Sequence, residues 1–207
     1  MYLEFHNKLK TLTSEEYIKS FIVYNSSQVI AGVKPASTMT IKKSCEKGYE
    51  SWKSIGEDFV RSINLETMEL RDDESSLIIL IFNRKLLYKV ISEEKTKKLL
   101  LNLGYNNKVD VTEYLNTLKN RYMINNCPHE LGIFLGIPIE DVNDFISCSE
   151  KKCLYCGYWK VYNNFDNAIK TFKMFDDIKN YTMDSFIKGV DLKDIVLNIK
   201  KDFSMYI

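Results

Sequence analysis

The chain of 207 residues has almost no excess of charge: 29 lysine and arginine residues stand against 28 aspartate and glutamate residues. Proteins that bind nucleic acid usually carry a basic excess, because contacts to phosphates supply most of their affinity. The lysine-rich spots at 42–43, 95–98 and 151–152 are short and close to glutamate, which is typical of a solvated surface. We therefore expect no nucleic-acid partner.

Long apolar runs are also missing. The longest, Leu77–Phe82, is far shorter than the roughly 20 residues of a membrane-spanning helix. The N-terminal MYLEFHNKLK lacks the apolar core of a signal peptide. We expect a cytoplasmic protein without membrane spans, in a compartment where thiols stay mostly reduced. Five cysteines, an odd number, likewise fit a disulfide framework poorly.

Familiar catalytic motifs are absent as well. The sequence has no glycine-rich phosphate loop, no HExxH and no GxSxG, which are the motifs of nucleotide binding, zinc-dependent proteolysis and serine hydrolysis. It also has no internal repeat and no low-complexity linker. No motif assigns a reaction, so the sequence does not decide whether the protein is an enzyme.

The chain does contain clear helical and strand-like patterns. Thr13–Glu16 has the form of a capping box, and a helix follows it to about Tyr24. The run Leu77–Phe82 is apolar at every position, which predicts a central strand with both faces covered. Periodicity predicts the remaining elements: helices at 46–63, 84–91, 93–103 and 111–123, strands at 38–43 and 155–162, and a hairpin at 65–83 that turns at 71–74.

These elements define an α+β fold. We expect one helix-rich domain over residues 1–207, with a small and mostly antiparallel sheet. Apolar residues return at helical spacing near the end of the chain, for example at Ala168, Phe172 and Phe175. The C-terminal part, from about 165 to 207, is therefore expected to be a helical extension of that domain.

Residues 128–146 resemble a helix-turn-helix. Gly136 suits the left-handed turn between two helices, and Gly132 and Val142 suit their close packing. A DNA-binding role conflicts with the charge, because the second helix carries three carboxylates and no lysine or arginine occurs between Pro128 and Lys151. We interpret this segment as a structural helical hairpin.

Cysteine is concentrated in one part of the chain. Cys148, Cys153 and Cys156 have the spacing C-x4-C-x2-C, which also occurs among iron–sulfur ligands. With Cys127 or His129 they could supply four ligands to zinc or iron. Two alternatives stay open: Cys153 and Cys156 could cycle as a redox dithiol, or the thiols could be small buried hydrophobes.

Three further positions are candidates for a site. His129 begins a short helix beside Glu130, where the positive helix end favours a neutral imidazole able to bind metal or accept a proton; a helix cap or surface residue is the alternative. Lys34 lies on the Gly/Pro-shaped loop AGVKPAS, where it could meet an anionic ligand or simply be solvated. Lys160 alternates with Trp159, so we expect these two side chains to face opposite sides of a strand.

Three blocks carry a resemblance to a known family. AGVKPAS from residue 31, PHELGIFLGIPIEDVNDFI at 128–146 and CGYWKVY at 156–162 resemble, in order and spacing, an uncharacterised domain-of-unknown-function family of anaerobic bacteria (DUF 3793-like). The resemblance runs from about Ile22 to Lys179. The matching residues are Lys34, Pro128, His129, Glu130, Gly132, Gly136, Pro138, Asp141, Trp159, Lys160 and Tyr162.

The polar matches have no packing reason to be specified, so they are the candidates for ligand binding: Lys34, His129, Glu130, Trp159, Lys160 and Tyr162. The family typically has a His-Cys-Ala-Pro-like segment before the lysine-bearing loop, and this chain has residues 23–27, VYNSS, there instead. Its cysteines also approach the Trp-Lys-Val-Tyr block with a different spacing. The resemblance implies, loosely, an association with flavodoxin and iron uptake.

Two functions of different classes follow. In the first, a cytoplasmic accessory factor of iron or redox metabolism uses the cysteine cluster to hold zinc or iron or to exchange a disulfide, with a flavodoxin-type redox partner. In the second, a non-catalytic module binds a small anionic ligand or a partner protein through Lys34, His129, Glu130 and Lys160. Acid–base catalysis by His129 and Glu130 would be a third, but no nucleophile or cofactor motif accompanies it.

Overall fold

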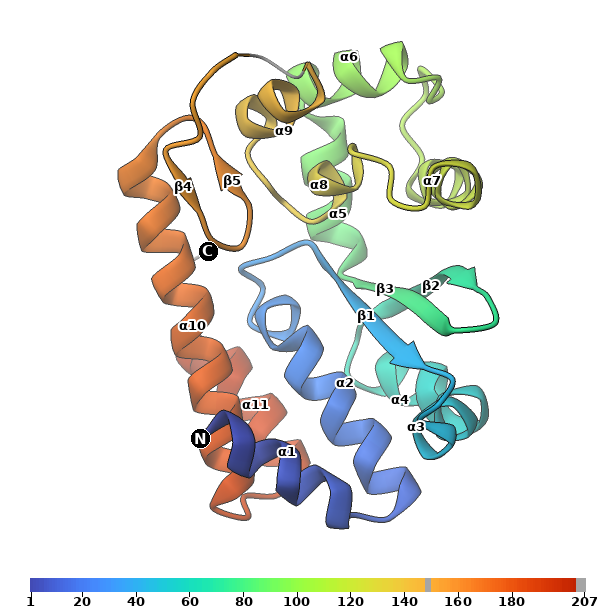
Figure 1. The fold of residues 1–207 in the computed structure, drawn as a ribbon, viewed down its shortest axis with the longest axis vertical. Helices are drawn as coiled ribbons and strands as arrows, with labels where there is room; N and C mark the ends of the chain where they lie inside the picture. The colour runs from blue at the N-terminus through green and yellow to red at the C-terminus, as the bar shows by residue number, and fades with distance from the viewer. Residues whose placement is uncertain (148–149, 204–207) are drawn as a thin grey trace.

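The computed structural model describes residues 1–147 and 150–203 and contains a three-stranded antiparallel sheet. The strands are β1 (Ala36–Lys42), β2 (Glu66–Asp72) and β3 (Ser76–Phe82), in the order β1-β3-β2 (Figure 1). All residues of β3 are buried, because strands cover both of its edges and helices cover both of its faces. The predictions of a small antiparallel sheet and of a fully buried central strand are confirmed.

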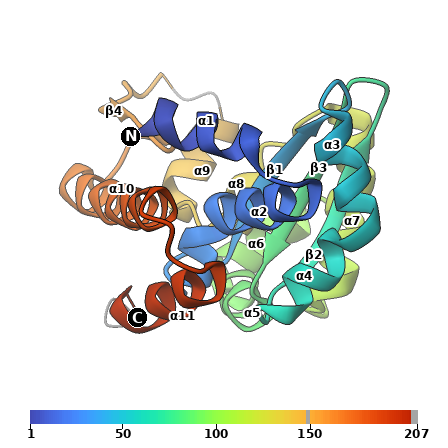
Figure 2. The same ribbon diagram turned by 90° about the horizontal axis from the view of Figure 1, so that it is seen from below.

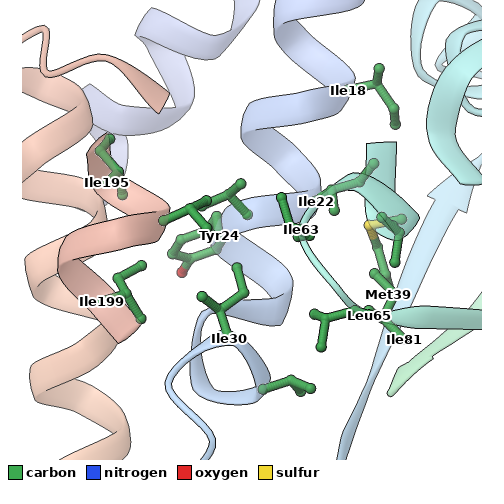
Figure 3. Close-up of a cluster of buried hydrophobic side chains, with 14 of the residues drawn as sticks. Ile18, Ile22, Tyr24, Ile30, Met39, Ile63, Leu65, Ile81, Ile195 and Ile199 are labelled. Carbon is green, nitrogen blue, oxygen red and sulfur yellow. The ribbon is translucent and has the colours of Figure 1, made fainter. Parts of the chain in front are cut away.

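One face of the sheet packs on the larger hydrophobic core. Leu77, Ile79 and Ile81 of β3 point into it. Figure 2 shows α2 between the sheet on one side and α10 and α11 on the other. Figure 3 shows side chains of α2, the sheet and α11 meeting in the core. The helices on this face are α1 (Tyr2–Thr11), α2 (Ser14–Ile30), α3 (Glu46–Ser51), α4 (Glu57–Ser62), α10 (Phe165–Ile187) and α11 (Leu192–Phe203), with a π-helical turn (Trp52–Gly56) between α3 and α4.

The opposite face carries a second core. Ile78, Leu80 and Phe82 of β3 alternate toward it, as the period of a strand requires. Five helices cover this face: α5 (Arg84–Ser92), α6 (Glu94–Asn102), α7 (Val111–Asn125), α8 (Leu131–Phe134) and α9 (Ile139–Ile146). The predicted helices at 84–91, 93–103 and 111–123 correspond to α5, α6 and α7.

Helix α2 shows where local patterning misleads. The capping box of Thr13 and Glu16 is present as predicted, but the helix continues to Ile30 instead of ending near Tyr24. Serine and asparagine usually weaken a helix. Here Asn25 Nδ2 and Ser26 Oγ donate to the carbonyls four residues earlier, and burial against the sheet and α10 stabilises the last turns.

A small hairpin replaces the single strand predicted at 155–162. Strands β4 (Tyr155–Cys156) and β5 (Lys160–Val161) pair antiparallel and lie between α9 and α10 (Figure 1). Gly157 makes the turn against α10 possible, because a Cβ atom there would stand 2.4 Å from the ring of Phe172. Among the described residues, no helix is long and apolar enough to cross a membrane.

Candidate functional site

A pocket of about 420 Å³ lies where the α8–α9 helical hairpin meets the β4–β5 hairpin. This volume falls in the range of small-molecule sites, which are mostly apolar with a few placed polar groups. The lining follows that pattern. It consists of Cys127, Pro128, His129, Leu131, Gly132, Leu135, Ile137, Asp141, Val142, Phe145, Tyr158, Trp159 and Lys160.

The helical hairpin shapes one wall of the pocket. A Cβ atom on Gly132 would stand 3.1 Å from Val142 and 3.3 Å from Ile137, so the small residue lets the two helices approach closely. Gly136 has φ +78° in the turn and packs on Pro35, where a Cβ atom would be 2.6 Å from the proline ring. The predicted structural hairpin is confirmed, and its turn is fixed against the loop that follows α2.

Asp141 holds the opposite wall in place. Its side chain is 2% exposed and accepts four hydrogen bonds. Trp159 Nε1 donates to one oxygen at 2.8 Å, and the backbone N–H groups of Tyr162 and Asn163 donate to the other at 3.0 and 2.8 Å. Asn163 Nδ2 adds a fourth bond at 3.0 Å. A buried carboxylate needs such partners, and these tie β5 and the following residues to α9.

Three side chains from separate segments meet at the mouth of the pocket. The rings of His129 and Phe145 are edge to face, with centroids 5.0 Å apart. Lys160 Nζ lies 5.5 Å from the centroid of the Phe145 ring, within the range of a cation–π contact. All three residues are solvent-exposed. The mouth therefore presents an ammonium, an imidazole and an aromatic ring around an apolar interior.

The hairpin turn packs on α10 from behind. Trp159 meets Phe172 edge to face at 4.4 Å, and Tyr158 contacts Phe172 and Phe175 at 5.6 and 5.1 Å between ring centroids. Because Trp159 lies in this turn, it and Lys160 line the same pocket. The prediction that they face opposite sides of a strand is wrong.

Other predicted site residues lie outside the pocket. Glu130 is 2% exposed, pairs with the guanidinium of Arg121 and accepts a bond of 3.3 Å from the Tyr105 hydroxyl. This places Glu130 inside the second core, so it forms no acid–base pair with His129. Tyr162 contributes its backbone N–H to Asp141.

Lys34 also lies outside the pocket lining, on the loop after α2. Its Nζ is 5.7 Å from the centroid of the Phe175 ring. Burial, together with the nearby positive charge of Lys179, lowers the pKa of Lys34 to about 8. Lys34 is therefore an unusual lysine, although it does not join His129 and Lys160.

The thiols do not assemble a metal centre within the described ranges 1–147 and 150–203. No three His, Cys, Asp or Glu side chains there come together in a way that could hold an ion. Cys127, Cys153 and Cys156 are free thiols, and Cys153 Sγ donates to the carbonyl of Tyr155 at 3.1 Å. Cys148 lies outside the described residues, so the predicted cysteine cluster stays a prediction.

Sequence reasoning missed three residues of the pocket region. Phe145 and Tyr158 line it, and Asp141 holds its wall together. Asp141 is one of the matching positions of the resemblance, but it is not among the predicted ligand-binding residues, and the carboxylates of its helix served only as evidence against DNA binding. The sequence did contain a signal for Asp141. It lies near the start of a helix that packs against the Trp-Lys-Val-Tyr block.

Comparison with known proteins identifies a family for the chain. The family described as "Protein of unknown function (DUF3793)" matches residues 22–196. No curated protein and no solved structure matches the chain. Since the match covers most of the sequence and includes the helical hairpin, the β4–β5 hairpin and the Lys34 loop, the chain belongs to the DUF3793 family of proteins of unknown function.

Proposed function

We propose that this cytoplasmic protein is a non-catalytic module that binds a small anionic molecule with an apolar, preferably aromatic, body. The observation that carries the proposal is the composition of the pocket. Apolar side chains line its interior, while Lys160, His129 and Phe145 meet at its mouth. Such a site suits a ligand whose apolar part is buried and whose negative group stays near the ammonium.

The burial of the apolar body would supply most of the affinity. Removing apolar surface from water contributes roughly 25 cal/mol per Å². Leu131, Leu135 and Val142 form part of this surface, and Trp159 offers a ring for stacking. Lys160 is exposed, so its ion pair with a ligand would contribute only about 0.2–1 kcal/mol. We therefore expect the charge to select the ligand and the apolar surface to hold it.

The rigid attachment of the wall supports binding without large rearrangement. Four hydrogen bonds to Asp141 hold the segment that carries Trp159 and Lys160. A pre-organised pocket loses less entropy when a ligand binds. The acid–base alternative has no such support, because Glu130 is paired with Arg121.

The chain offers a direct reporter for this proposal. It has two tryptophans, Trp159 in the pocket and Trp52 in the larger core, where Nε1 donates to Glu69 at 3.0 Å. The experiment titrates ¹⁵N-labelled protein with 2-naphthoate, an aromatic carboxylate. We expect the indole cross-peak of Trp159 to shift in a saturable way and that of Trp52 to stay in place. Equal movement of both peaks, or of neither, would contradict the proposal.

Variants at the mouth separate the two contributions. Phe145→Ala should weaken 2-naphthoate binding about tenfold through lost contact area, and Lys160→Met should weaken it about two- to fivefold. Lys170→Met removes an exposed lysine of α10 and serves as the matched control with unchanged affinity. Unchanged affinity in Phe145→Ala would place the ligand elsewhere.

The accessory-factor hypothesis can be tested separately. A role in iron or redox metabolism through Cys153 and Cys156, with a flavodoxin-type partner, needs a bound ion or a disulfide that cycles. Elemental analysis of untagged protein purified without oxygen tests the first of these needs. Stoichiometric zinc or iron that disappears in the Cys153→Ser/Cys156→Ser variant would favour this hypothesis. On the pocket proposal, the same variant binds 2-naphthoate normally.

A further inference from the structure

A second polar cluster lies outside the pocket, where the loop after α2 approaches α10 and the β4–β5 hairpin (Figure 1). Two lysines reach it from different elements. Lys34 extends from the loop over the ring of Phe175, and Lys179 of α10 lies with its Nζ 4.9 Å from the centroid of the Tyr24 ring on α2. Both are partly buried, and their stems pack on aromatic rings.

Neither ammonium group has a hydrogen-bond acceptor among residues 1–147 and 150–203. Within the part of the chain that the structure describes, no hydrogen bond or ion pair involves Lys34 or Lys179. Burial lowers the pKa of both side chains, and the charge of Lys179 lowers that of Lys34 further. The two charges are thus close enough to repel each other.

A third donor of the cluster is unsatisfied. Gln28 of α2 is 2% exposed and its amide lies beside the Tyr158 hydroxyl, yet its Nε2 finds no hydrogen-bond partner among the described residues. A buried donor without an acceptor costs about 1–3 kcal/mol, so native proteins rarely leave one unless water or a ligand completes it.

The acceptors at hand do not balance these donors. Asp176 of α10 raises the pKa of Lys179 through its charge, but it already accepts a bond of 2.8 Å from the Tyr158 hydroxyl. His6 of α1 packs on Tyr24 with ring centroids 6.4 Å apart, and its Nε2 is a further buried polar atom without a partner among the described residues. The cluster therefore sets two cations and an amide donor against the carboxylate of Asp176, one oxygen of which already accepts a bond from Tyr158.

We propose that Lys34, Lys179 and Gln28 form a binding site for a small oxyanion of the phosphate class, distinct from the pocket at the α8–α9 hairpin. An oxyanion presents several hydrogen-bond acceptors, and the two ammonium groups and the amide are donors that need acceptors. Its charge would relieve the repulsion between the lysines. Tyr158, which lines the pocket and bonds Asp176 beside this cluster, is the residue that both sites share.

The test is thermal unfolding of the full chain at pH 7 with increasing inorganic phosphate, at an ionic strength kept constant with sodium chloride. A ligand that binds only the folded state raises the Tm in a saturable way. We expect this response in the wild-type protein. Lys34→Met and Lys179→Met should each weaken phosphate binding at least tenfold, and Gln28→Met should weaken it severalfold.

A second measurement tests whether the positive charges of the cluster lack a partner in the absence of phosphate. Without phosphate, Lys34→Met should have a higher Tm than the wild type, because it removes a buried charge that has no partner. Lys170→Met controls for a generic surface lysine, and Lys160→Met controls for the pocket; both should keep the wild-type phosphate response. The proposal is overturned if phosphate gives no saturable response beyond that of chloride, or if Lys179→Met and Lys34→Met respond like the wild type.

Discussion

The substitution Asp141→Asn tests how the pocket wall is held. One carboxylate oxygen of Asp141 accepts three hydrogen bonds, from the N–H groups of Tyr162 and Asn163 and from Asn163 Nδ2, and the other accepts the bond from Trp159. Asparagine has the same shape but only one acceptor oxygen. Its better orientation keeps the three bonds on the carbonyl and turns its NH₂ group toward the indole N–H of Trp159.

The expected cost follows from this geometry. One charge-assisted hydrogen bond is lost, two donors then face each other in a buried place, and the three remaining bonds lose their charge. A hydrogen bond to a charged group contributes about 1.5–3 kcal/mol, and an unsatisfied buried donor costs about 1–3 kcal/mol. Because part of the hairpin can relax into solvent, we expect the free energy of unfolding to fall by about 2–4 kcal/mol.

Urea unfolding measures this loss, and the indole cross-peak of Trp159 reports where it occurs. The Trp159 peak should move in Asp141→Asn while that of Trp52 does not. Asp177→Asn, an exposed position on α10, should stay within about 0.5 kcal/mol of the wild type. A similar stability of Asp141→Asn and wild type, with an unmoved Trp159 peak, would refute the reasoning.

Three further changes have defined outcomes. In urea unfolding at pH 7, Lys34→Met should have a free energy of unfolding about 1–3 kcal/mol above that of the wild type. Because burial lowers the pKa of Lys34 to about 8, the unfolded wild-type chain binds more protons than the folded one above that pH, and this difference between variant and wild type should shrink as the pH rises from 8 to 10.5. A difference that stays constant would refute this. Gly157→Ala places a methyl group 2.4 Å from Phe172. It should lower the free energy of unfolding by about 1–3 kcal/mol and weaken 2-naphthoate binding severalfold. Unchanged binding would show that the turn need not approach α10. Glu130→Gln should lower the free energy of unfolding by about 1–3 kcal/mol, because Arg121 loses its buried partner. The same variant should bind 2-naphthoate with an affinity within twofold of the wild type, and a large loss of affinity would place Glu130 in the site.

Local patterns predicted those parts of the fold that local physics determines. The capping box at Thr13 needs only residues three apart, and the turn at Gly136 needs only a residue that tolerates positive φ. Leu77–Phe82 could be recognised as a central strand because no surface strand is apolar on both faces. The last turns of α2 could not be predicted, since tertiary burial stabilises serine and asparagine there.

The candidate site was predictable by segment but not by side-chain direction. His129, Trp159 and Lys160 share the pocket as neighbouring blocks suggested, whereas Glu130, next in sequence to His129, points into the second core. Successive residues at a helix start point in different directions, and Glu130 finds its ion-pair partner, Arg121, on the distant helix α7. The sequence likewise does not predict that Lys179 lies near Lys34, because the packing of α10 on α2 brings them together.

The most direct test of the pocket proposal compares two ligands that differ only in charge. The measurement is the Kd of 2-naphthoate and of the neutral 2-naphthylmethanol, both followed by the indole cross-peak of Trp159, in wild type and Lys160→Met. The proposal predicts that wild type prefers the carboxylate about two- to fivefold and that Lys160→Met loses this preference while still binding both ligands. Equal affinities in the wild type, or a preference that survives in Lys160→Met, would contradict the assignment of Lys160 as the group that selects an anion.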